Sequence, residues 1–182
     1  ETIITRWRVM EQPKFTINTT MSKEDYRRFL YIATFRRNKA VIPLLALISL
    51  IAGLMISLDG GTVSLTRIMI NWLAFFALAI AVAVIKIEVK KAQRIKTDKT
   101  GTFNSVNTLK FYEDRIVFEN EALMSRGELN YSQFYALMES KDYFIFYFTL
   151  NQASLIRKGD IEDLDAFKEF VVEKFADKYR RI

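Results

Sequence analysis

Residues Ala40–Leu58 read AVIPLLALISLIAGLMISL, and residues Ile68–Ile85 read IMINWLAFFALAIAVAVI. Neither stretch contains a charged residue. An α-helix rises about 1.5 Å per residue, so about 20 apolar residues cross a hydrocarbon core of about 30 Å. The two stretches therefore predict a transmembrane helical hairpin over residues 40–85. The alternative is a buried helix pair in a soluble protein.

Basic residues flank the outer ends of this predicted hairpin, whereas the connecting stretch Asp59–Arg67 carries one acid and one base. Lysine and arginine are retained on the cytoplasmic side of a membrane. We therefore expect a multi-pass protein of the cell (inner) membrane with both termini in the cytoplasm. The flanking cations are also candidates for contact with the headgroups of the anionic inner leaflet. They are Arg36, Arg37 and Lys39 before the first span, and Lys86, Lys90, Lys91 and Arg94 after the second.

Small residues recur along both predicted spans. Small side chains let two membrane helices approach closely. In an antiparallel hairpin, we expect positions whose numbers sum to about 130 to lie at similar depth. This rule predicts an internal helix interface, with dimerisation through the same face as the alternative, so a homo-oligomer is left open. The three predicted pairs are Ser49 with Ala81, Gly53 with Ala77, and Ser57 with Ala74.

The composition argues against most enzyme mechanisms. The 182 residues include no cysteine and no histidine, which removes disulfides, thiolate chemistry and the commonest metal ligand. One dense group of acids, at positions 160–165, lies where a final helix is predicted to begin, and acids stabilise a helix N-terminus. We therefore predict no catalytic residue, no cofactor and no metal site.

The net charge of +6 is concentrated in the segments that flank the predicted spans. Residues 101–182 carry 11 basic and 14 acidic residues. Membrane topology thus explains the basic charge, and we predict no nucleic-acid partner.

The remaining sequence divides into three predicted parts. Residues 1–39 contain two alternating stretches, Ile3–Val9 and Phe15–Thr20, and then an amphipathic helix that begins after Ser22. The basic side of that helix either contacts lipid headgroups or is merely solvated. Residues 86–100 form a basic helical linker. Residues 101–182 form a soluble domain in the cytosol.

In residues 101–182 the apolar period changes from 3.6 to 2, which indicates short strands. A final helix is then predicted, with Asp160 as its N-cap and an apolar face that extends from Ile161 to Tyr179. The predicted class is α+β: a transmembrane hairpin plus an antiparallel β-sandwich or half-barrel that the C-terminal helix closes. The predicted strands are Asn107–Tyr112, Arg115–Asn120, Ser125–Asn130, Phe134–Glu139, Tyr143–Leu150 and Ser154–Lys158.

The order of these segments resembles the YcxB-like family of bacterial membrane proteins. The resemblance rests on Phe15–Thr20 followed by SKEDY at 22–26, on FYEDRIVF at 111–118, on YSQFYALME at 131–139, on YFIFY at 143–147 and on IRK at 156–158. It implies two spans and a pleckstrin-homology-like C-terminal domain. Family members often carry Trp where this chain has Tyr131. The resemblance implies no activity.

We therefore expect a membrane-anchored, non-catalytic module that presents the C-terminal domain to an unidentified protein partner, for interaction or regulation. Arg157 and Lys158 are the candidate contact residues of that domain. Two alternatives remain open. One is an enzyme that acts on lipid or cell-envelope substrates, and the other is a small homo-oligomeric membrane pore.

Overall fold

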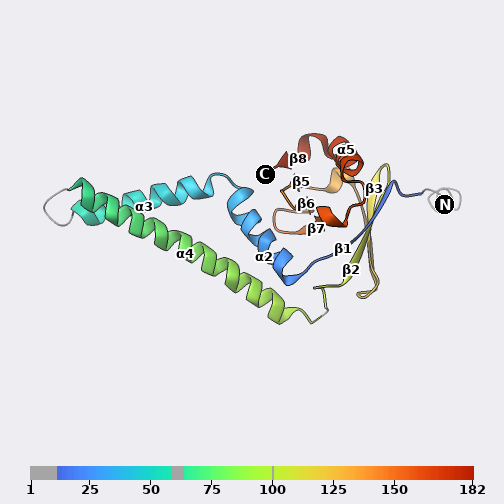
Figure 1. Ribbon diagram of the computed structural model, residues 1–182, viewed down its shortest axis with the longest axis horizontal. Helices are drawn as coiled ribbons and strands as arrows, with labels where there is room; N and C mark the ends of the chain where they lie inside the picture. Colours follow the sequence, from blue (N-terminus) through green and yellow to red (C-terminus); the bar gives the residue numbers. More distant parts are fainter. Residues whose placement is uncertain (1–11, 59–63, 100) are drawn as a thin grey trace. The chain divides into compact units, whose positions relative to one another are not determined.

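The computed structural model describes residues 12–58, 64–99 and 101–182 (Figure 1). The chain forms two compact units. The helical unit comprises residues Lys23–Thr97, and the sheet unit comprises the described residues up to Ser22 together with Asp98–Ile182. Two long apolar helices, two four-stranded sheets and a C-terminal helix confirm the predicted α+β class. The predicted strand Ile3–Val9, residues 59–63 of the connecting stretch and residue 100 of the predicted linker lie outside the described residues.

The helical unit begins with helix α2 (Lys23–Tyr31), which starts directly after Ser22 as predicted. A π-helical turn, η1 (Ile32–Arg36), leads to helix α3 (Val41–Leu58). Helix α4 (Leu65–Thr97) contains the second apolar stretch and runs without a break through most of the predicted basic linker.

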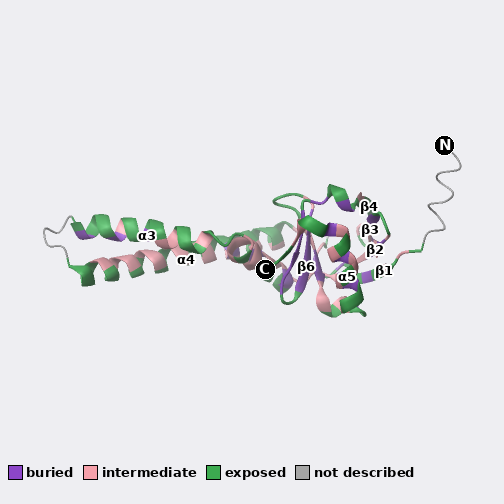
Figure 2. Cartoon of the chain, turned by 90° about the horizontal axis from the view of Figure 1, so that it is seen from above, coloured by how far each residue is buried: buried purple, intermediate pink, exposed green. Residues whose placement is uncertain are grey.

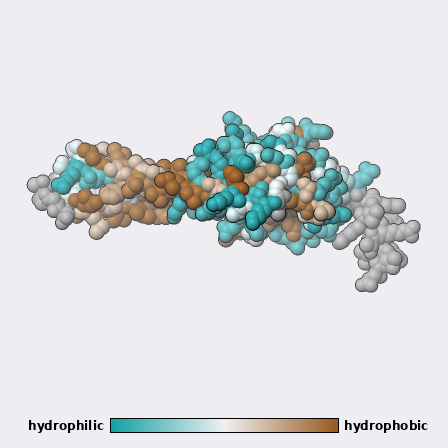
Figure 3. All heavy atoms as spheres, turned by 90° about the horizontal axis from the view of Figure 1, so that it is seen from below, coloured by the Kyte–Doolittle hydropathy of each residue, from teal (hydrophilic) through white to brown (hydrophobic). Residues whose placement is uncertain are grey.

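Helices α3 and α4 are long and apolar enough to cross a membrane, which fits the predicted spans. Their apolar side chains are largely exposed (Figure 2), and they give this part of the molecule the hydrophobic surface of Figure 3. A soluble core helix would bury such a surface, so the exposure favours a lipid environment over the buried-pair alternative.

The first sheet has the order β1-β2-β3-β4, and every neighbouring pair is antiparallel. Its strands begin and end close to the predicted positions, and β1 shows the clearest alternation of buried and exposed residues. The four strands are β1 (Phe15–Thr20), β2 (Val106–Phe111), β3 (Arg115–Asn120) and β4 (Ser125–Asn130).

Strand β1 pairs with β2 along its whole length, from Phe15 opposite Phe111 to Thr20 opposite Val106. The segment 1–39 is therefore not a separate part, because β1 belongs to the sheet unit and α2 to the helical unit. A two-stranded piece is marginally stable alone, and β1 is stabilised by joining a larger sheet. In chain order, the whole helical unit is inserted between two strands that pair with each other.

The second sheet has the order β7-β6-β5-β8. Strands β5 (Ala136–Glu139), β6 (Tyr143–Tyr147) and β7 (Ala153–Arg157) form an antiparallel meander, as predicted. Strand β8 (Tyr179–Arg181) pairs parallel to β5. The two sheets are not closed into a barrel.

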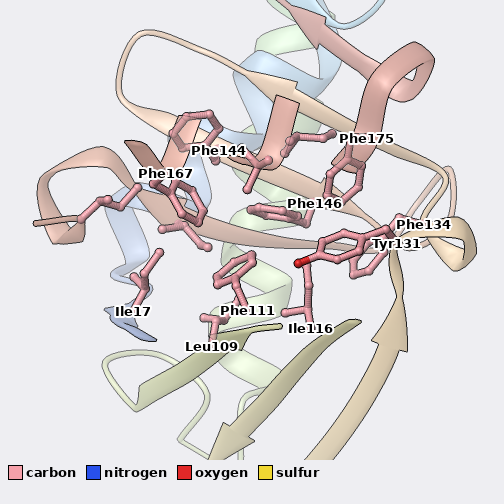
Figure 4. Packing of buried hydrophobic residues seen from close by; sticks show 14 residues of the cluster. Ile17, Leu109, Phe111, Ile116, Tyr131, Phe134, Phe144, Phe146, Phe167 and Phe175 are labelled. Carbon is pink, nitrogen blue, oxygen red and sulfur yellow. The ribbon is translucent and has the colours of Figure 1, made fainter. Parts of the chain in front are cut away.

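Phe167 and Phe175 of helix α5 (Leu164–Phe175) pack among the aromatic side chains of the two sheets in the core (Figure 4). Phe167 is fully buried, with ring centroids 4.9 Å from Phe111 of β2 and 5.4 Å from Phe144 of β6. At the other end of the helix, the ring centroid of Phe175 lies 5.5 Å from that of Phe146 and 5.4 Å from that of Phe134. One helix therefore joins the cores of both sheets.

Two predictions about this helix are wrong in detail. Asp163, not Asp160, is the N-cap, since its carboxylate accepts a hydrogen bond from the backbone N–H of Ala166 at 3.0 Å. Asp160 instead ends a 3₁₀ turn, η3 (Lys158–Asp160). At the other end, the helix stops at Phe175, and Ala176 takes a left-handed φ of 40°. Tyr179 therefore lies on strand β8 rather than on the helical face.

Candidate functional site

The interface of the α3–α4 hairpin depends on Gly53. A Cβ atom built on Gly53 would lie 2.8 Å from the backbone N of Trp72 and 3.1 Å from its Cα atom. Because both are backbone atoms, only glycine fits without moving a helix. One turn away, the Ser57 hydroxyl accepts a hydrogen bond from the Asn71 amide at 3.0 Å. The Trp72 indole N–H donates to the Ala46 carbonyl at 3.1 Å.

The predicted small face of α3 is therefore buried, as expected: Ser49 is 3% exposed and Ser57 is fully buried. The predicted partner face on α4 is wrong. Gly53 faces the backbone of Trp72 and not Ala77. The assumed sum of about 130 is too high, because the helix ends that flank the loop, Leu58 and Leu65, sum to 123, and Gly53 and Trp72 sum to 125. All three predicted alanines are on the exposed surface of α4, and they are Ala74, Ala77 and Ala81.

The predicted headgroup-contact residues lie near the ends of the two apolar stretches. Arg36 and Arg37 lie at the end of η1 and directly after it, Lys39 precedes α3, and the other four lie on α4. Lys91 forms an ion pair with Glu88, with an N–O distance of 3.7 Å. The exposed members of the set are Arg36, Lys39, Lys86, Lys90 and Arg94.

Glu88 links α2 to the part of α4 that follows the apolar stretch. Its carboxylate accepts hydrogen bonds from the Arg27 guanidinium at 2.6 Å and from the Tyr31 hydroxyl at 3.2 Å. The Arg27 hydrogen bond is the main reason why the pKa of Glu88 is lowered. The sequence pattern predicts Arg27 on a face that contacts headgroups or solvent. Its ion pair with Glu88 instead stabilises the helical unit.

Within the sheet unit, the carboxylate of Glu139 is the centre of a polar cluster. Its side chain is 2% exposed at the end of β5. It accepts hydrogen bonds from Lys158, from the Tyr179 hydroxyl, and from Lys168 at 3.2 Å. These donors come from η3, β8 and α5, so Glu139 joins the end of the second sheet to the C-terminal helix.

The charge state of this cluster follows from its hydrogen bonds. Burial alone would raise the pKa of Glu139, but hydrogen bonds from Lys158, Tyr179 and Lys168 outweigh it and lower the pKa to about 2. Burial and the hydrogen bond to Glu139 raise the pKa of Tyr179 to about 12. At neutral pH, Glu139 is thus a permanent carboxylate. A general acid or base instead needs a pKa near the working pH.

The two predicted domain-contact residues lie side by side in the chain, but their side chains bind different groups. Arg157 donates to Asp160 at 3.0 Å and to the Thr20 hydroxyl at 2.6 Å, and the Thr19 hydroxyl also donates to Asp160 at 2.6 Å. We call these four residues the β1 latch, because they fix the last residues of β1 to the end of β7. Lys158, in contrast, belongs to the Glu139 cluster.

The contacts of Glu139, Glu88 and Trp72 could not be predicted from the sequence. Glu139 is the last residue of an otherwise apolar strand, which is the signal of a strand end rather than of a buried charge. Its lysine partners lie 19 and 29 positions away, beyond any local spacing rule. Among the described residues, no group of three or more acidic side chains could hold a metal ion.

Residues 111–171 match the YcxB-like protein family. The YcxB-like segment begins at the last residue of β2 and ends within α5, so it covers the later strands and the start of the helix that packs on them. The resemblance predicted from the sequence is thereby confirmed over these residues, and the two apolar helices agree with a membrane protein. No curated protein and no solved structure matches the chain.

Proposed function

We propose that the chain is a membrane-anchored, non-catalytic module that presents a pleckstrin-homology-like domain at the cytoplasmic face for protein interaction or regulation. One observation carries this proposal: the candidate membrane hairpin is inserted between β1 and β2, two strands that pair with each other. The sheet unit is therefore bound to the helical unit by two covalent connections, which hold the domain close to the membrane.

The order of elements supports the pleckstrin-like assignment. Strands β1 to β7 form two antiparallel sheets, a helix follows them, and that helix packs its aromatic face on both sheets. Strand β8 is an addition to that plan. The cytoplasmic location rests on the exposed cations near the ends of the apolar stretches and on the positive-inside rule.

The polar groups of the domain support a non-catalytic role. Glu139 is a buried carboxylate with a pKa of about 2 and three donors, which suits stabilisation and not proton transfer. Asp163 caps α5, and Asp160 belongs to the β1 latch. These acidic side chains thus have structural partners, whereas an enzyme would direct them toward a substrate.

Topology is tested by labelling single cysteines, because the chain has no cysteine of its own. We expect Ser64→Cys, before α4, to react with a membrane-impermeant maleimide on intact cells. Lys141→Cys, in the exposed β5–β6 turn, should react only after the membrane is opened. The reverse pattern would overturn the cytoplasmic placement.

Protein interaction is tested by photo-crosslinking in native membranes. Tyr135 is 52% exposed and precedes β5, so a photoreactive residue there can reach a bound partner. We expect a discrete protein adduct that disappears when Phe167→Ala and Phe170→Ala together unfold the domain but the hairpin still inserts. Position 141, after the far end of β5, is the matched control. A folded, inserted protein that gives no protein adduct from either position would contradict the interaction role.

A further inference from the structure

We propose that the outer edge of strand β4 pairs with the same strand of a second copy of this chain, in an antiparallel arrangement centred on Gly127. This inference is independent of the proposed function, because it concerns a surface and a partner that the function does not specify. It goes beyond the homo-oligomer left open above, which was placed in the membrane helices.

Strand β4 is the last strand of the first sheet, so one of its edges has no neighbouring strand among the described residues. It reads SRGELN, and five of its six residues are exposed. Exposed sheet edges carry backbone N–H and C=O groups that can pair with another strand. Such edges are often blocked by charge or proline. Here the two charged residues, Arg126 and Glu128, have opposite signs and stand on either side of a glycine.

The hydrogen bonds of the sheet show which backbone groups point outward. Tyr112 N–H donates to Arg115 C=O at 2.9 Å, and Tyr131 N–H donates to Asp114 C=O at 3.4 Å. In antiparallel sheets, hydrogen-bonded and non-hydrogen-bonded residue pairs alternate. Both bonds give the same result: β3 uses its odd-numbered residues toward β2 and its even-numbered residues toward β4.

It follows that Phe118, which is opposite Gly127, directs its hydrogen bonds to Gly127. Arg126 and Glu128 are opposite Glu119 and Val117, so their own backbone groups point away from β3. At each of these two positions, the backbone N–H can therefore donate a hydrogen bond to a further strand and the backbone C=O can accept one from it.

Charge then selects one register for a second copy. If Gly127 faces Gly127 of the other copy, each Arg126 faces a Glu128, and the outward backbone groups of these residues meet as hydrogen-bonded pairs. If both strands shift by one residue in one direction, Arg126 faces Arg126 of the other copy. If they shift by one residue in the other direction, Glu128 faces Glu128. Opposite charges across a strand pair are favourable and like charges are unfavourable. The sequence around Gly127 is therefore complementary to itself.

The side chains leave room for this pairing. Arg126 is 73% exposed and Glu128 is 50% exposed, although each also has an ion-pair partner on β3. A Cβ atom on Gly127 would meet nothing within 4 Å. At the symmetry axis, where two strands approach most closely in a non-hydrogen-bonded pair, glycine places no side chain in the way.

Disulfide crosslinking of the full chain in membrane vesicles tests this register. In the proposed pair, the two Cα atoms at position 127 lie about 4.5 Å apart, within the roughly 4.4–6.8 Å that a disulfide requires. The two Cα atoms at position 125 lie roughly 14 Å apart along the strands. Under mild oxidation we therefore expect Gly127→Cys to form at least about tenfold more dimer than Ser125→Cys.

A charge test keeps the proposal falsifiable if Gly127→Cys disturbs the strand. Arg126→Glu chains alone should not pair, and Glu128→Arg chains alone should not pair, because each then brings like charges together. Co-expressed with two different tags, the two variants should form a mixed dimer, because every pair of facing positions 126 and 128 then carries opposite charges. A folding defect within either variant chain would persist in the mixture. Recovery of dimerisation in the mixture therefore reports on the contact between the two copies.

Three outcomes would overturn the proposal. Equal crosslinking at positions 125 and 127 would indicate random collision. An adduct of Gly127→Cys with a different protein would assign the edge to another partner. A mixed population that pairs no better than either variant alone would show that Arg126 and Glu128 do not face each other.

Discussion

Replacing Glu139 by Gln should destabilise the sheet unit by removing the negative charge that faces Lys158 and Lys168. Removing one partner of a buried ion pair costs about 3–5 kcal/mol. The lysine side chains keep 18% and 35% of their exposure, and Gln keeps one acceptor oxygen for Tyr179. We therefore expect a loss of about 2–3 kcal/mol in the free energy of unfolding.

Pulse proteolysis of the full chain in detergent micelles, over a urea series, measures this loss. With a urea dependence of about 1–3 kcal/mol per M, the midpoint should fall by about 1–2 M. Glu119→Gln is the matched control, because Glu119 pairs with Lys110 at 2.6 Å on the more exposed outer face of the first sheet. Such pairs contribute about 0–1 kcal/mol. If Glu139→Gln shifts the midpoint no more than Glu119→Gln does, the cluster does not stabilise the domain.

The same cluster predicts a pH dependence. The pKa of Glu139 is about 2 in the folded chain and about 4.3 when unfolded. Because the folded pKa is the lower one, this stabilisation is complete above about pH 5 and is lost as the pH falls toward about 2. The difference in unfolding free energy between the wild type and Glu139→Gln should therefore shrink over this range. A difference that stays constant across the whole range would refute the assigned charge state.

Two further predictions concern the hairpin and the core. Gly53→Leu should abolish a disulfide between Ser57→Cys and Asn71→Cys, because a leucine at position 53 would push the helices apart. Ala77→Leu should leave the disulfide intact, because Ala77 is exposed. The opposite result would restore the helix register predicted from the sequence. Phe167→Ala should lower the free energy of unfolding, measured by pulse proteolysis, by about 3–5 kcal/mol, because the ring contacts both sheets. A loss below about 1 kcal/mol would show that the ring does not join the two sheets.

Most of the strands could be predicted because each carries its own signal. Between Phe111 and Arg157 most strands contain short runs of apolar residues, such as YFIFY in β6, and polar turns separate them. The helix end was not predictable in the same way. Phe175 and Tyr179 are four positions apart, which continues a helical face, and no glycine or proline marks the change of direction at Ala176. Contacts with β5 hold Tyr179 on a strand instead.

The candidate site residues show a similar division. The small face of α3 could be read from a four-residue repeat, since burial of such a face needs only close helix approach. Its predicted partner on α4 is wrong because the assumed sum of about 130 is too high for the helix ends that flank the loop, Leu58 and Leu65. Glu139 and its lysines could not be paired because their contacts join residues far apart in the chain.

The pairing of β1 with β2 also determines how the domain responds to a mechanical load. The two connections to the hairpin leave from Thr20 and Val106, which are opposite each other at the same end of the ladder. If the membrane helices move apart, the strands are peeled open from that end, one residue pair after another, rather than sheared along their full length. Peeling needs far less force than shear. The first pair to open contains Thr20, whose hydroxyl is bound by Arg157, so the β1 latch is the element that such a load must break first.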